Sequence, residues 1–220
     1  MSPGSTLSLF ADTPGEKSQQ AICPGAMVLR AFALADTAAL LAAIDAVTVA
    51  APFRHLVTPG GLRMSVAMTN CGGVGWASDR RGYRYDALDT DSGKPWPVMP
   101  AIFLQLAQRA AAAAGFNHFK PNACLINRYA PGARLTLHQD RDERDLRQPI
   151  VSVSLGLPAV FQFGGAQRTD KPLRVPLQHG DVVVWGGPAR LNFHGILPLK
   201  DGHHELLGTQ RINLTFRKAV

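Results

Sequence analysis

The sequence predicts an α+β protein that is mainly β, a double-stranded β-helix (jelly roll) with supporting helices and a lid. The second half of the chain divides into short segments rich in β-branched and aromatic residues, separated by Gly, Pro and Asp turns. Only two segments, both before residue 116, carry apolar residues at helical spacing. With 220 residues and 46% hydrophobic content, the chain can bury a sizeable core as one domain.

The N-terminal part of the chain is expected to supply one strand and one helix. Residues 1–20 are rich in Ser, Gly, Pro and Gln, and we expect them to be loosely ordered. Residues 25–32 have the pattern of a strand. Asp36 is expected to cap a helix that runs through Val47, whose apolar stripe indicates core packing.

Residues 52–97 form a region of short segments broken by Gly and Pro, with aromatic and basic side chains interleaved. Such a region can form hairpins and loops that cover a site. Arginines among exposed rings are typical of single-stranded nucleic-acid binding, because bases stack on rings while guanidinium groups meet phosphates. Packing of the rings into a local core is the alternative. Trp76 lies among Gly75, Ser78 and Arg80, a context that we expect to pack poorly and to leave the ring exposed.

A second helix is expected from about Pro100 to Gly115, since proline favours the first turn of a helix and glycine its end. Its apolar face indicates that it packs on a sheet. The rest of the chain predicts eight strands, at residues 123–129, 135–138, 150–155, 160–163, 173–177, 182–185, 192–196 and 212–216. The two sheets of a jelly roll accommodate eight such strands economically. The predicted catalytic domain spans residues 21–220, with the lid at about 52–97 and the jelly-roll core at about 120–217.

Charge and composition restrict the class of protein. There are 23 Lys+Arg against 16 Asp+Glu, a net charge of +7, which suits a polyanionic partner but also fits a merely basic protein. Three cysteines without C-x-x-C spacing suggest neither a disulfide framework nor a zinc site. No apolar run approaches the ~18 residues of a membrane span, and the N-terminus lacks the pattern of a signal peptide. We therefore expect a cytoplasmic protein with no membrane partner and no obligate protein partner.

The segment NRYAPGARLTLHQDRDE, residues 127–143, sets His138 and Asp140 two residues apart in a strand pattern. Strand alternation then points both side chains to the same face. One more histidine from a distant strand would complete a facial triad of two imidazoles and one carboxylate, which leaves three positions of an octahedral Fe(II) open. A surface histidine beside a turn aspartate is the alternative explanation of H-x-D alone.

Two histidines could be the third metal ligand. His179 begins a second H-x-D, His179-Gly180-Asp181, where the aspartate would serve the geometry of a turn before the next strand. His194 lies inside the strand pattern LNFHGI and is the favoured candidate.

The last strand pattern, RINLTFR, has polar residues at even spacing, which puts Arg211, Asn213, Thr215 and Arg217 on one face. Arginines that face into a barrel need anions, since an unpaired buried charge is very costly. A dicarboxylate cosubstrate would supply two carboxylates with the bidentate geometry that arginine favours.

The segments NRYAPGARLTLHQDRDE, PIVSVSLGLPAVFQFGG, HGDVVVWGG and RINLTFR together resemble the AlkB family of Fe(II)/2-oxoglutarate-dependent dioxygenases, over about residues 25–217. The segment MSVAMTNCG, Trp76 and the RGYRY run are similar to the nucleotide-recognition lid of the bacterial DNA-repair branch. One departure is Ile212, where the closest relatives would have tyrosine. Its side chain is expected to face away from the cofactor.

The resemblance implies a role for each matching position. The implied Fe(II) ligands are His138, Asp140 and His194. The implied 2-oxoglutarate contacts are Asn127, Arg128, Tyr129, Arg211, Asn213, Thr215 and Arg217, with Asn127 and Arg217 at the carboxylate and keto end beside the metal. The implied substrate contacts are Met68, Trp76, Tyr83, Asp142 and Arg168, with Trp76 stacking on the damaged base.

The activity implied by the resemblance is oxidative demethylation of 1-methyladenine and 3-methylcytosine type bases, with release of formaldehyde, succinate and carbon dioxide. The implied partner is alkylated single-stranded or double-stranded DNA, with RNA as an alternative. Such bases are cations, so a carboxylate at Asp142 would favour them over the neutral base. Two other functions fit the same residues: a hydroxylase of protein side chains or small metabolites, which would not need the basic, aromatic lid, and a non-catalytic jelly-roll module that binds an anion.

Overall fold

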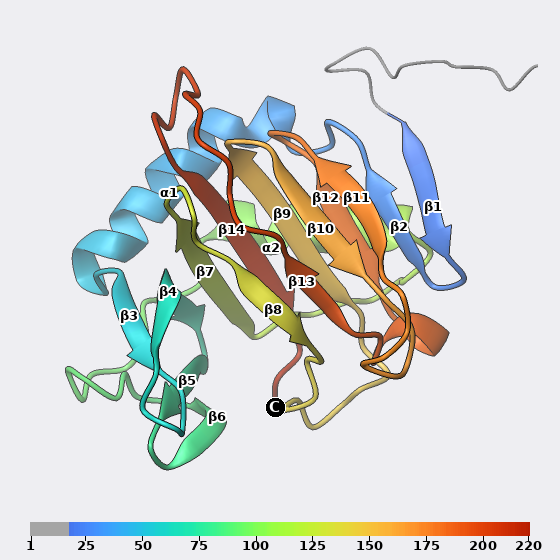
Figure 1. Cartoon of the computed structure of the whole chain (residues 1–220). Coiled ribbons are helices and arrows are strands. Elements are labelled where there is room, and N and C mark those ends of the chain that lie inside the picture. Colours follow the sequence, from blue (N-terminus) through green and yellow to red (C-terminus); the bar gives the residue numbers. More distant parts are fainter. Residues whose placement is uncertain (1–17) are drawn as a thin grey trace, which may run out of the picture.

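The computed structural model describes residues 18–220, in which two β-sheets face each other (Figure 1). The larger sheet has the strand order β1-β2-β12-β9-β14-β7-β4-β3, the smaller sheet has the order β11-β10-β13-β8, and β5 and β6 form a separate pair. The strands are β1 (Gln19–Cys23), β2 (Ala26–Leu29), β3 (Arg54–Val57), β4 (Arg63–Gly72), β5 (Gly75–Asp79), β6 (Gly82–Asp86), β7 (Ala123–Tyr129), β8 (Leu135–His138), β9 (Ile150–Gly156), β10 (Ala159–Phe163), β11 (Leu173–Leu177), β12 (Val182–Trp185), β13 (His194–Ile196) and β14 (Arg211–Arg217). The helices are α1 (Thr37–Ala50) and α2 (Ala101–Ala113), with short 3-10 turns at Leu34–Asp36 and Gly187–Ala189.

The jelly roll that the sequence predicts is confirmed. Strands β7 to β14 correspond to the eight predicted strands, and they divide four and four: β12, β9, β14 and β7 are neighbours in the larger sheet, while β11, β10, β13 and β8 make up the smaller one. The antiparallel pairing of β13 with β8 joins segments more than fifty residues apart in the sequence. This pairing carries the candidate site described below.

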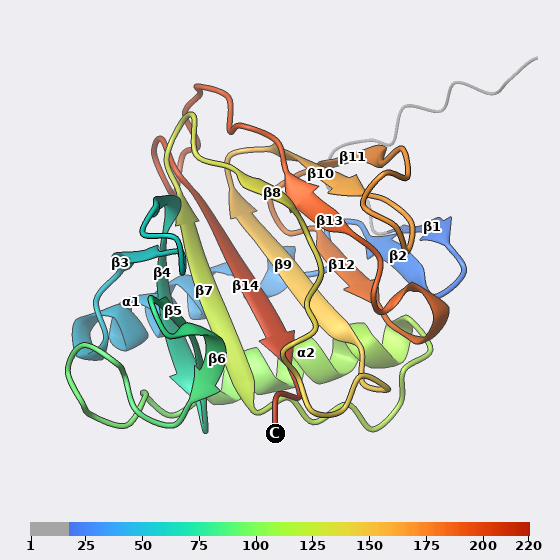
Figure 2. The same ribbon diagram turned by 60° about the horizontal axis from the view of Figure 1, so that its bottom comes forward.

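Both helices cover the outer face of the larger sheet, away from the smaller sheet (Figure 2). Strand β12 shows how the sequence builds the layers, since Val182 and Val184 pack outward against the helices, whereas Val183 and Trp185 point inward between the sheets. The inner core is aromatic at one end, where Trp185 packs against Phe161 and Phe163 at ring-centroid distances of 5.9 and 6.2 Å.

The two predicted helices are present, and Asp36 is the N-cap residue of the first, but its side chain does not cap the helix. Helix α1 continues three residues beyond Val47 to Ala50. Asp36 makes no side-chain capping hydrogen bond, because a 3-10 turn precedes the helix and gives Asp36 a helical backbone conformation. Its carboxylate instead forms an ion pair with Arg109 of α2, which joins the two helices. Neither helix of the described residues is long and apolar enough to cross a membrane.

The region expected to be a lid, residues 52–97, divides into two parts. Strands β3 and β4 belong to the larger sheet, where β4 pairs with β7 so that Met68 lies opposite Asn127. Only the β5–β6 hairpin stands apart (Figure 1). At the N-terminus, Gln19 and Gln20 belong to β1, so the loose order expected for residues 1–20 is wrong for these two residues, and residues 1–17 lie outside the described residues.

Candidate functional site

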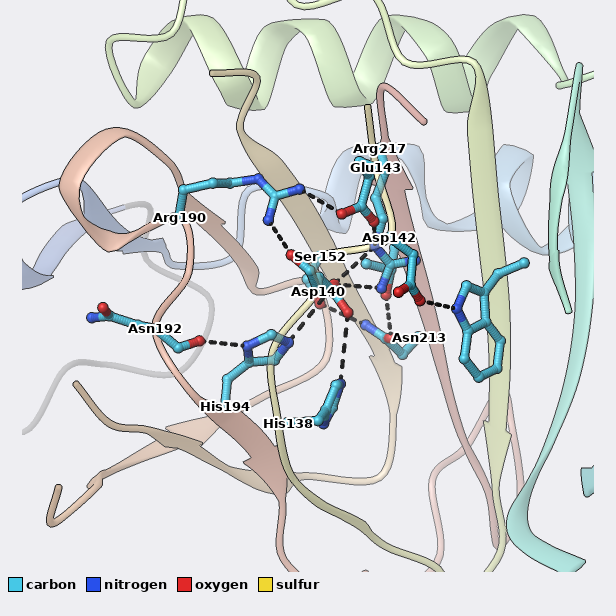
Figure 3. A network of polar contacts seen from close by, with 12 residues as sticks. His138, Asp140, Asp142, Glu143, Ser152, Arg190, Asn192, His194, Asn213 and Arg217 are labelled. Atoms are coloured by element: carbon cyan, nitrogen blue, oxygen red, sulfur yellow. Dashed lines mark hydrogen bonds and ion pairs between the residues drawn. The ribbon is translucent and has the colours of Figure 1, made fainter. Parts of the chain in front are cut away.

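His138, Asp140 and His194 come together at one end of the smaller sheet (Figure 3). His138 ends β8, and its pairing partner across the sheet is His194, the first residue of β13. The Asp140 carboxylate lies 3.8 Å from His138 Nε2 through Oδ1 and 3.8 Å from His194 Nε2 through Oδ2. One ligand atom from each residue lies within 4.8 Å of the others, so the group could hold a metal ion.

The ring orientations suit metal binding. Nδ1 of His138 lies 2.8 Å from the Thr136 carbonyl oxygen, and Nδ1 of His194 lies 3.0 Å from that of Asn192. Because a carbonyl only accepts, each Nδ1 carries a proton, and Nε2 of each ring is the nitrogen that faces Asp140 and can bind a metal. Burial, together with the neighbouring His138, lowers the pKa of His194 to about 4, which keeps this imidazole neutral.

Asp140 is held in its charged form. Its burial opposes ionisation, but Arg217 and the two histidines outweigh that effect and hold the pKa of the carboxyl well below its usual range. Arg217 donates to Asp140 Oδ2 through Nε at 2.8 Å and through Nη2 at 2.6 Å. An ionised carboxylate is the protonation state that a divalent metal requires of this ligand.

The second H-x-D, at His179, serves the fold instead. His179 Nδ1 accepts the Gly156 N–H at 2.9 Å, and its Nε2 lies 3.2 Å from the Thr37 hydroxyl. The Asp181 carboxylate accepts the Ala31 N–H at 2.9 Å and forms a 2.7 Å ion pair with Arg30. These contacts explain why the motif lies away from the triad.

Strand β14 lines the inner cavity with its polar face, as the even spacing predicts, and all four of the polar residues are buried. Arg211 donates to the Ser154 hydroxyl at 2.8 Å, and its guanidinium lies 4.9 Å from the ring centroid of Tyr129. Its Nε and Nη1 have no hydrogen-bond partner. Burial lowers the pKa of Arg211, so this charge is costly without an anion.

A row of amide and hydroxyl groups lies between the two arginines. Asn213 Nδ2 donates to the Ser152 hydroxyl at 2.8 Å and to the Val153 carbonyl at 2.9 Å. Asn213 Oδ1 accepts from the Thr215 hydroxyl at 2.9 Å and from Asn127 Nδ2 at 3.2 Å. These bonds fix Asn127 and Asn213 as rigid walls of the cavity.

Arg128 does not reach this cavity. Residues on either side of it in β7, Asn127 and Tyr129, point inward, so strand alternation turns Arg128 to the outer face. There it is exposed, with its guanidinium 4.6 Å from the ring centroid of Phe53. The structure therefore does not bring Arg128 together with the other residues predicted to contact 2-oxoglutarate, and its role there stays a prediction.

The β5–β6 hairpin brings an aromatic pair to the cavity. Trp76 and Tyr83 stack with ring centroids 5.5 Å apart and an angle of 14° between the planes. Trp76 Nε1 donates to Asp142 Oδ2 at 3.1 Å. Met68 and Arg168 also line the cavity, and the Arg168 guanidinium lies 6.0 Å from the ring centroid of Phe193.

The expected reason for the exposure of Trp76 is wrong. Gly75 and Ser78 are buried, and a side chain at Gly75 would collide with the Trp96 ring. The Asn70 amide holds the Trp76 backbone through two 3.0 Å hydrogen bonds, from Trp76 N–H to Oδ1 and from Nδ2 to the Trp76 carbonyl. The residues around Trp76 are therefore well packed, and Trp76 itself is half-buried with its ring on the cavity wall.

Two charged residues that sequence reasoning missed lie behind the triad (Figure 3). Glu143 is buried and accepts from Arg190 Nη2 at 2.9 Å, and its other oxygen lies 3.3 Å from Arg217 Nε. Arg190 also donates to the backbone carbonyl of Asp140 at 2.6 Å. In the sequence, the acidic residues after H-x-D were the only indication that Glu143 belongs to the site, and nothing indicated that Arg190 does.

The cavity that these residues enclose has a volume of about 840 Å³. Among the described residues, four buried side-chain atoms lack a hydrogen-bond partner: Asn127 Oδ1, Trp185 Nε1, and Arg211 Nε and Nη1. All four belong to residues that line this cavity. Since buried polar groups are normally paired, the cavity fits a polar, anionic ligand beside the candidate metal ligands.

Comparisons with known proteins agree with this geometry. Residues 25–217 match the model of the 2OG-Fe(II) oxygenase superfamily. The alpha-ketoglutarate-dependent dioxygenase AlkB of Escherichia coli K12 is 59% identical over 97% of this chain and 98% of its own length. The Arabidopsis thaliana DNA N(6)-methyladenine demethylase ALKBH1C is 32% identical over 67% of this chain and 38% of its own length. The solved structure of OsALKBH1 superposes with a TM-score of 0.80 at 28% identity, covering 91% of this chain and all of that one.

Proposed function

Because this chain belongs to the AlkB family of 2OG-Fe(II) oxygenases, and is thus an Fe(II)- and 2-oxoglutarate-dependent dioxygenase, we propose that it demethylates N-alkylated nucleobases in nucleic acid. The observation that carries the proposal is the aromatic pair Trp76 and Tyr83 on the wall of the cavity that holds the triad. Relatives named as AlkB and as a DNA demethylase support it.

In this proposal His138, Asp140 and His194 bind Fe(II), and the inner face of β14 binds 2-oxoglutarate. The two unpartnered nitrogen atoms of Arg211 would donate to the distal carboxylate, beside Tyr129. Asn127 and Arg217 would contact the end nearest the metal. Arg217 uses Nε and Nη2 for Asp140, which leaves Nη1 for the cosubstrate.

The base would lie between the hairpin and the metal. A base extruded from its strand can stack on Trp76, whose backbone is fixed by Asn70. Asp142 lies at the same place and would favour a base that carries positive charge, as 1-methyladenine and 3-methylcytosine do. Met68 and Arg168 complete the wall.

When bound, Fe(II) and 2-oxoglutarate supply the oxidation of the N-methyl group by dioxygen, with succinate, carbon dioxide and finally formaldehyde as products. The chain itself directs Nε2 of both imidazoles toward Asp140 through the contacts of their Nδ1 atoms, and it keeps Asp140 ionised. Its aromatic inner core, which includes Trp185 and Phe161, excludes water from one side of the cavity.

The test is incubation of the enzyme with Fe(II), 2-oxoglutarate and an oligonucleotide that carries one 1-methyladenine or 3-methylcytosine. Mass spectrometry should find the oligonucleotide lighter by one methylene, with formaldehyde and succinate released in equal amounts. Parallel single-stranded DNA, double-stranded DNA and RNA substrates would decide which nucleic acid is preferred. Succinate release that responds to free amino acids or peptides, but not to any methylated oligonucleotide, would contradict the proposal and favour a hydroxylase of protein side chains or small metabolites.

The net charge of +7 supports a polyanionic substrate, and the proposal includes a cytoplasmic location and action without an obligate protein partner. A non-catalytic anion-binding module would bind 2-oxoglutarate without any turnover. Single-turnover measurement of succinate with Fe(II) and oxygen distinguishes that module from an enzyme.

A further inference from the structure

Two consecutive acidic residues join the β5–β6 hairpin to the triad. In the hairpin, Trp76 of β5 lies directly opposite Tyr85 of β6. Trp76 Nε1 donates to Asp142, and the Tyr85 hydroxyl donates to Glu143 Oε1 at 2.7 Å. The two members of this cross-strand pair are thus hydrogen-bonded to Asp142 and Glu143. These two acidic residues follow the candidate metal ligand Asp140 closely in the sequence.

Glu143 continues this connection inward. Its Oε1, which accepts the Tyr85 hydroxyl, also lies 3.3 Å from Arg217 Nε, and its Oε2 accepts from Arg190 Nη2 at 2.9 Å. Both arginines contact Asp140, Arg217 at the carboxylate and Arg190 at the backbone carbonyl (Figure 3). The side chains of Glu143, Arg190 and Arg217 are exposed by only 2, 4 and 7%, so solvent screens these contacts little.

Without Glu143, two guanidinium groups would face one carboxylate, that of Asp140. Arg217 Nε would then keep Asp140 Oδ2 as its remaining acceptor in the described contacts, and the guanidinium would lose the second carboxylate that fixes its orientation toward Asp140. The Tyr85 hydroxyl fixes the Glu143 oxygen that Arg217 uses. The geometry of a candidate metal ligand therefore depends on a hydroxyl group of the hairpin.

We propose that Glu143 and Tyr85 are positioning residues, through which the β5–β6 hairpin sets the Asp140–Arg217 pair and so the affinity for metal and 2-oxoglutarate. This inference rests on the proposed roles of Asp140 and Arg217. It adds that the β5–β6 hairpin, which is proposed to hold the base through Trp76, also supports the metal site through Tyr85.

The test uses Tyr85→Phe, which removes one hydroxyl group and keeps the ring. Binding of Mn(II) and then of 2-oxoglutarate to the full-length protein is measured by calorimetry, without oxygen chemistry and without nucleic acid. We expect the joint affinity to fall by about three- to tenfold, less than the roughly ten- to hundredfold worth of a hydrogen bond to a charged group, because Tyr85 acts on the metal site only through Glu143. The matched control is Ser78→Ala, which removes a hydroxyl of the same hairpin that donates to the Val57 carbonyl instead, and should leave both affinities unchanged.

A second variant, Glu143→Gln, should lower the same affinities further, and the double variant should fall no lower than Glu143→Gln alone, because both changes act through one chain of contacts. Unaltered Mn(II) and 2-oxoglutarate binding in Tyr85→Phe, with weakened binding of a methylated oligonucleotide only, would overturn the inference and reduce Tyr85 to a residue of the base site. The binding measurements need no nucleic acid, so a failure to demethylate oligonucleotides would leave them interpretable. If Glu143→Gln fails to fold, Tyr85→Phe still decides the outcome.

Discussion

Replacing Arg211 with methionine should change stability and cosubstrate affinity in opposite directions. In the ligand-free protein the guanidinium is 1% exposed, with one hydrogen bond to Ser154, the ring of Tyr129 alongside, and two nitrogen atoms unpartnered. A buried charge without a counter-ion is destabilising, and replacement of buried ionic groups by apolar side chains of similar volume is neutral or stabilises by about 1 to 4 kcal/mol. We expect a gain of this size for the Arg211→Met protein without ligand.

The affinity for 2-oxoglutarate should fall. The charge-assisted hydrogen bonds of Arg211 to a carboxylate are worth about 1.5 to 3 kcal/mol, which corresponds to a loss of roughly ten- to a hundredfold in affinity. For a chain of this size, 1 kcal/mol shifts the melting temperature by about 2 to 4 °C. The ligand-free variant should therefore melt several degrees higher than the wild type. Added 2-oxoglutarate should raise the melting temperature of the wild type by more than it raises that of the variant.

The assay combines denaturant or thermal unfolding, with and without 2-oxoglutarate and Mn(II), with direct titration of the cosubstrate. Arg128→Met is the matched control, because Arg128 is exposed on the opposite face of the neighbouring strand and should not affect 2-oxoglutarate binding. Arg211→Lys keeps the charge but loses the planar fork, so it should lower affinity without stabilising the ligand-free protein. A less stable Arg211→Met protein with an unchanged 2-oxoglutarate titration would refute the assignment of Arg211 to the cosubstrate.

Three further predictions concern the triad, the loop after β6 and the hairpin. Alanine at any of the candidate ligands (His138, Asp140, His194) should abolish Mn(II) binding and turnover, whereas His179→Ala should keep both; calorimetry that finds the reverse would show that the ligands are misassigned. Burial opposes ionisation of Asp89, but Arg54, the Asp91 N–H and the Ser92 hydroxyl outweigh this effect and lower the pKa of Asp89 to about 2. The ionised carboxylate should therefore contribute about 2 kcal/mol to the free energy of unfolding above pH 4, and this contribution should be lost as the pH falls through 2. The free energies of unfolding of Asp89→Asn and of the wild type should therefore converge as the pH falls toward 2, and a difference that does not change with pH would contradict this. Trp76→Ala should weaken oligonucleotide binding by about 1 to 3 kcal/mol while the fold and metal binding persist; a loss of stability of ~3 to 5 kcal/mol with proportional loss of all activity would assign Trp76 to the core.

The fold was largely predictable because each strand of the jelly roll carries its own local signal. Alternation in β12 and the even polar spacing in β14 follow from the pleat of a strand, and both appear in the structure. The same rule, applied to β7, would have placed Arg128 outside the cavity, because its two neighbours in the strand both belong to the inner face. The place of strand β4 in the larger sheet was not predicted, since its pairing with β7 is a contact between distant segments that its own residues do not specify.

The candidate site was predictable only where its residues share an element or a motif. His138 and Asp140 are two residues apart, and the four polar residues of β14 share one face, so spacing alone groups them. Arg190 directly follows a 3-10 turn, and Tyr85 lies on the hairpin, far along the chain from Glu143. Nothing local to either residue shows that it will meet a buried carboxylate, because that meeting depends on how the layers pack.

The charges of the site favour joint binding of metal and cosubstrate. The charges of Asp140, in the triad, and of Glu143, behind it, offset those of Arg190 and Arg217, so these four side chains sum to zero and Arg211 leaves one uncompensated positive charge. A divalent metal alone would raise this to three positive charges in a buried cavity, and dianionic 2-oxoglutarate would return it to one. Each ligand therefore offsets the charge that makes the other unfavourable, and by linkage each should raise the affinity for the other. A cationic base adds a further positive charge, which leaves Asp142, beside Trp76, as the side chain that can compensate it.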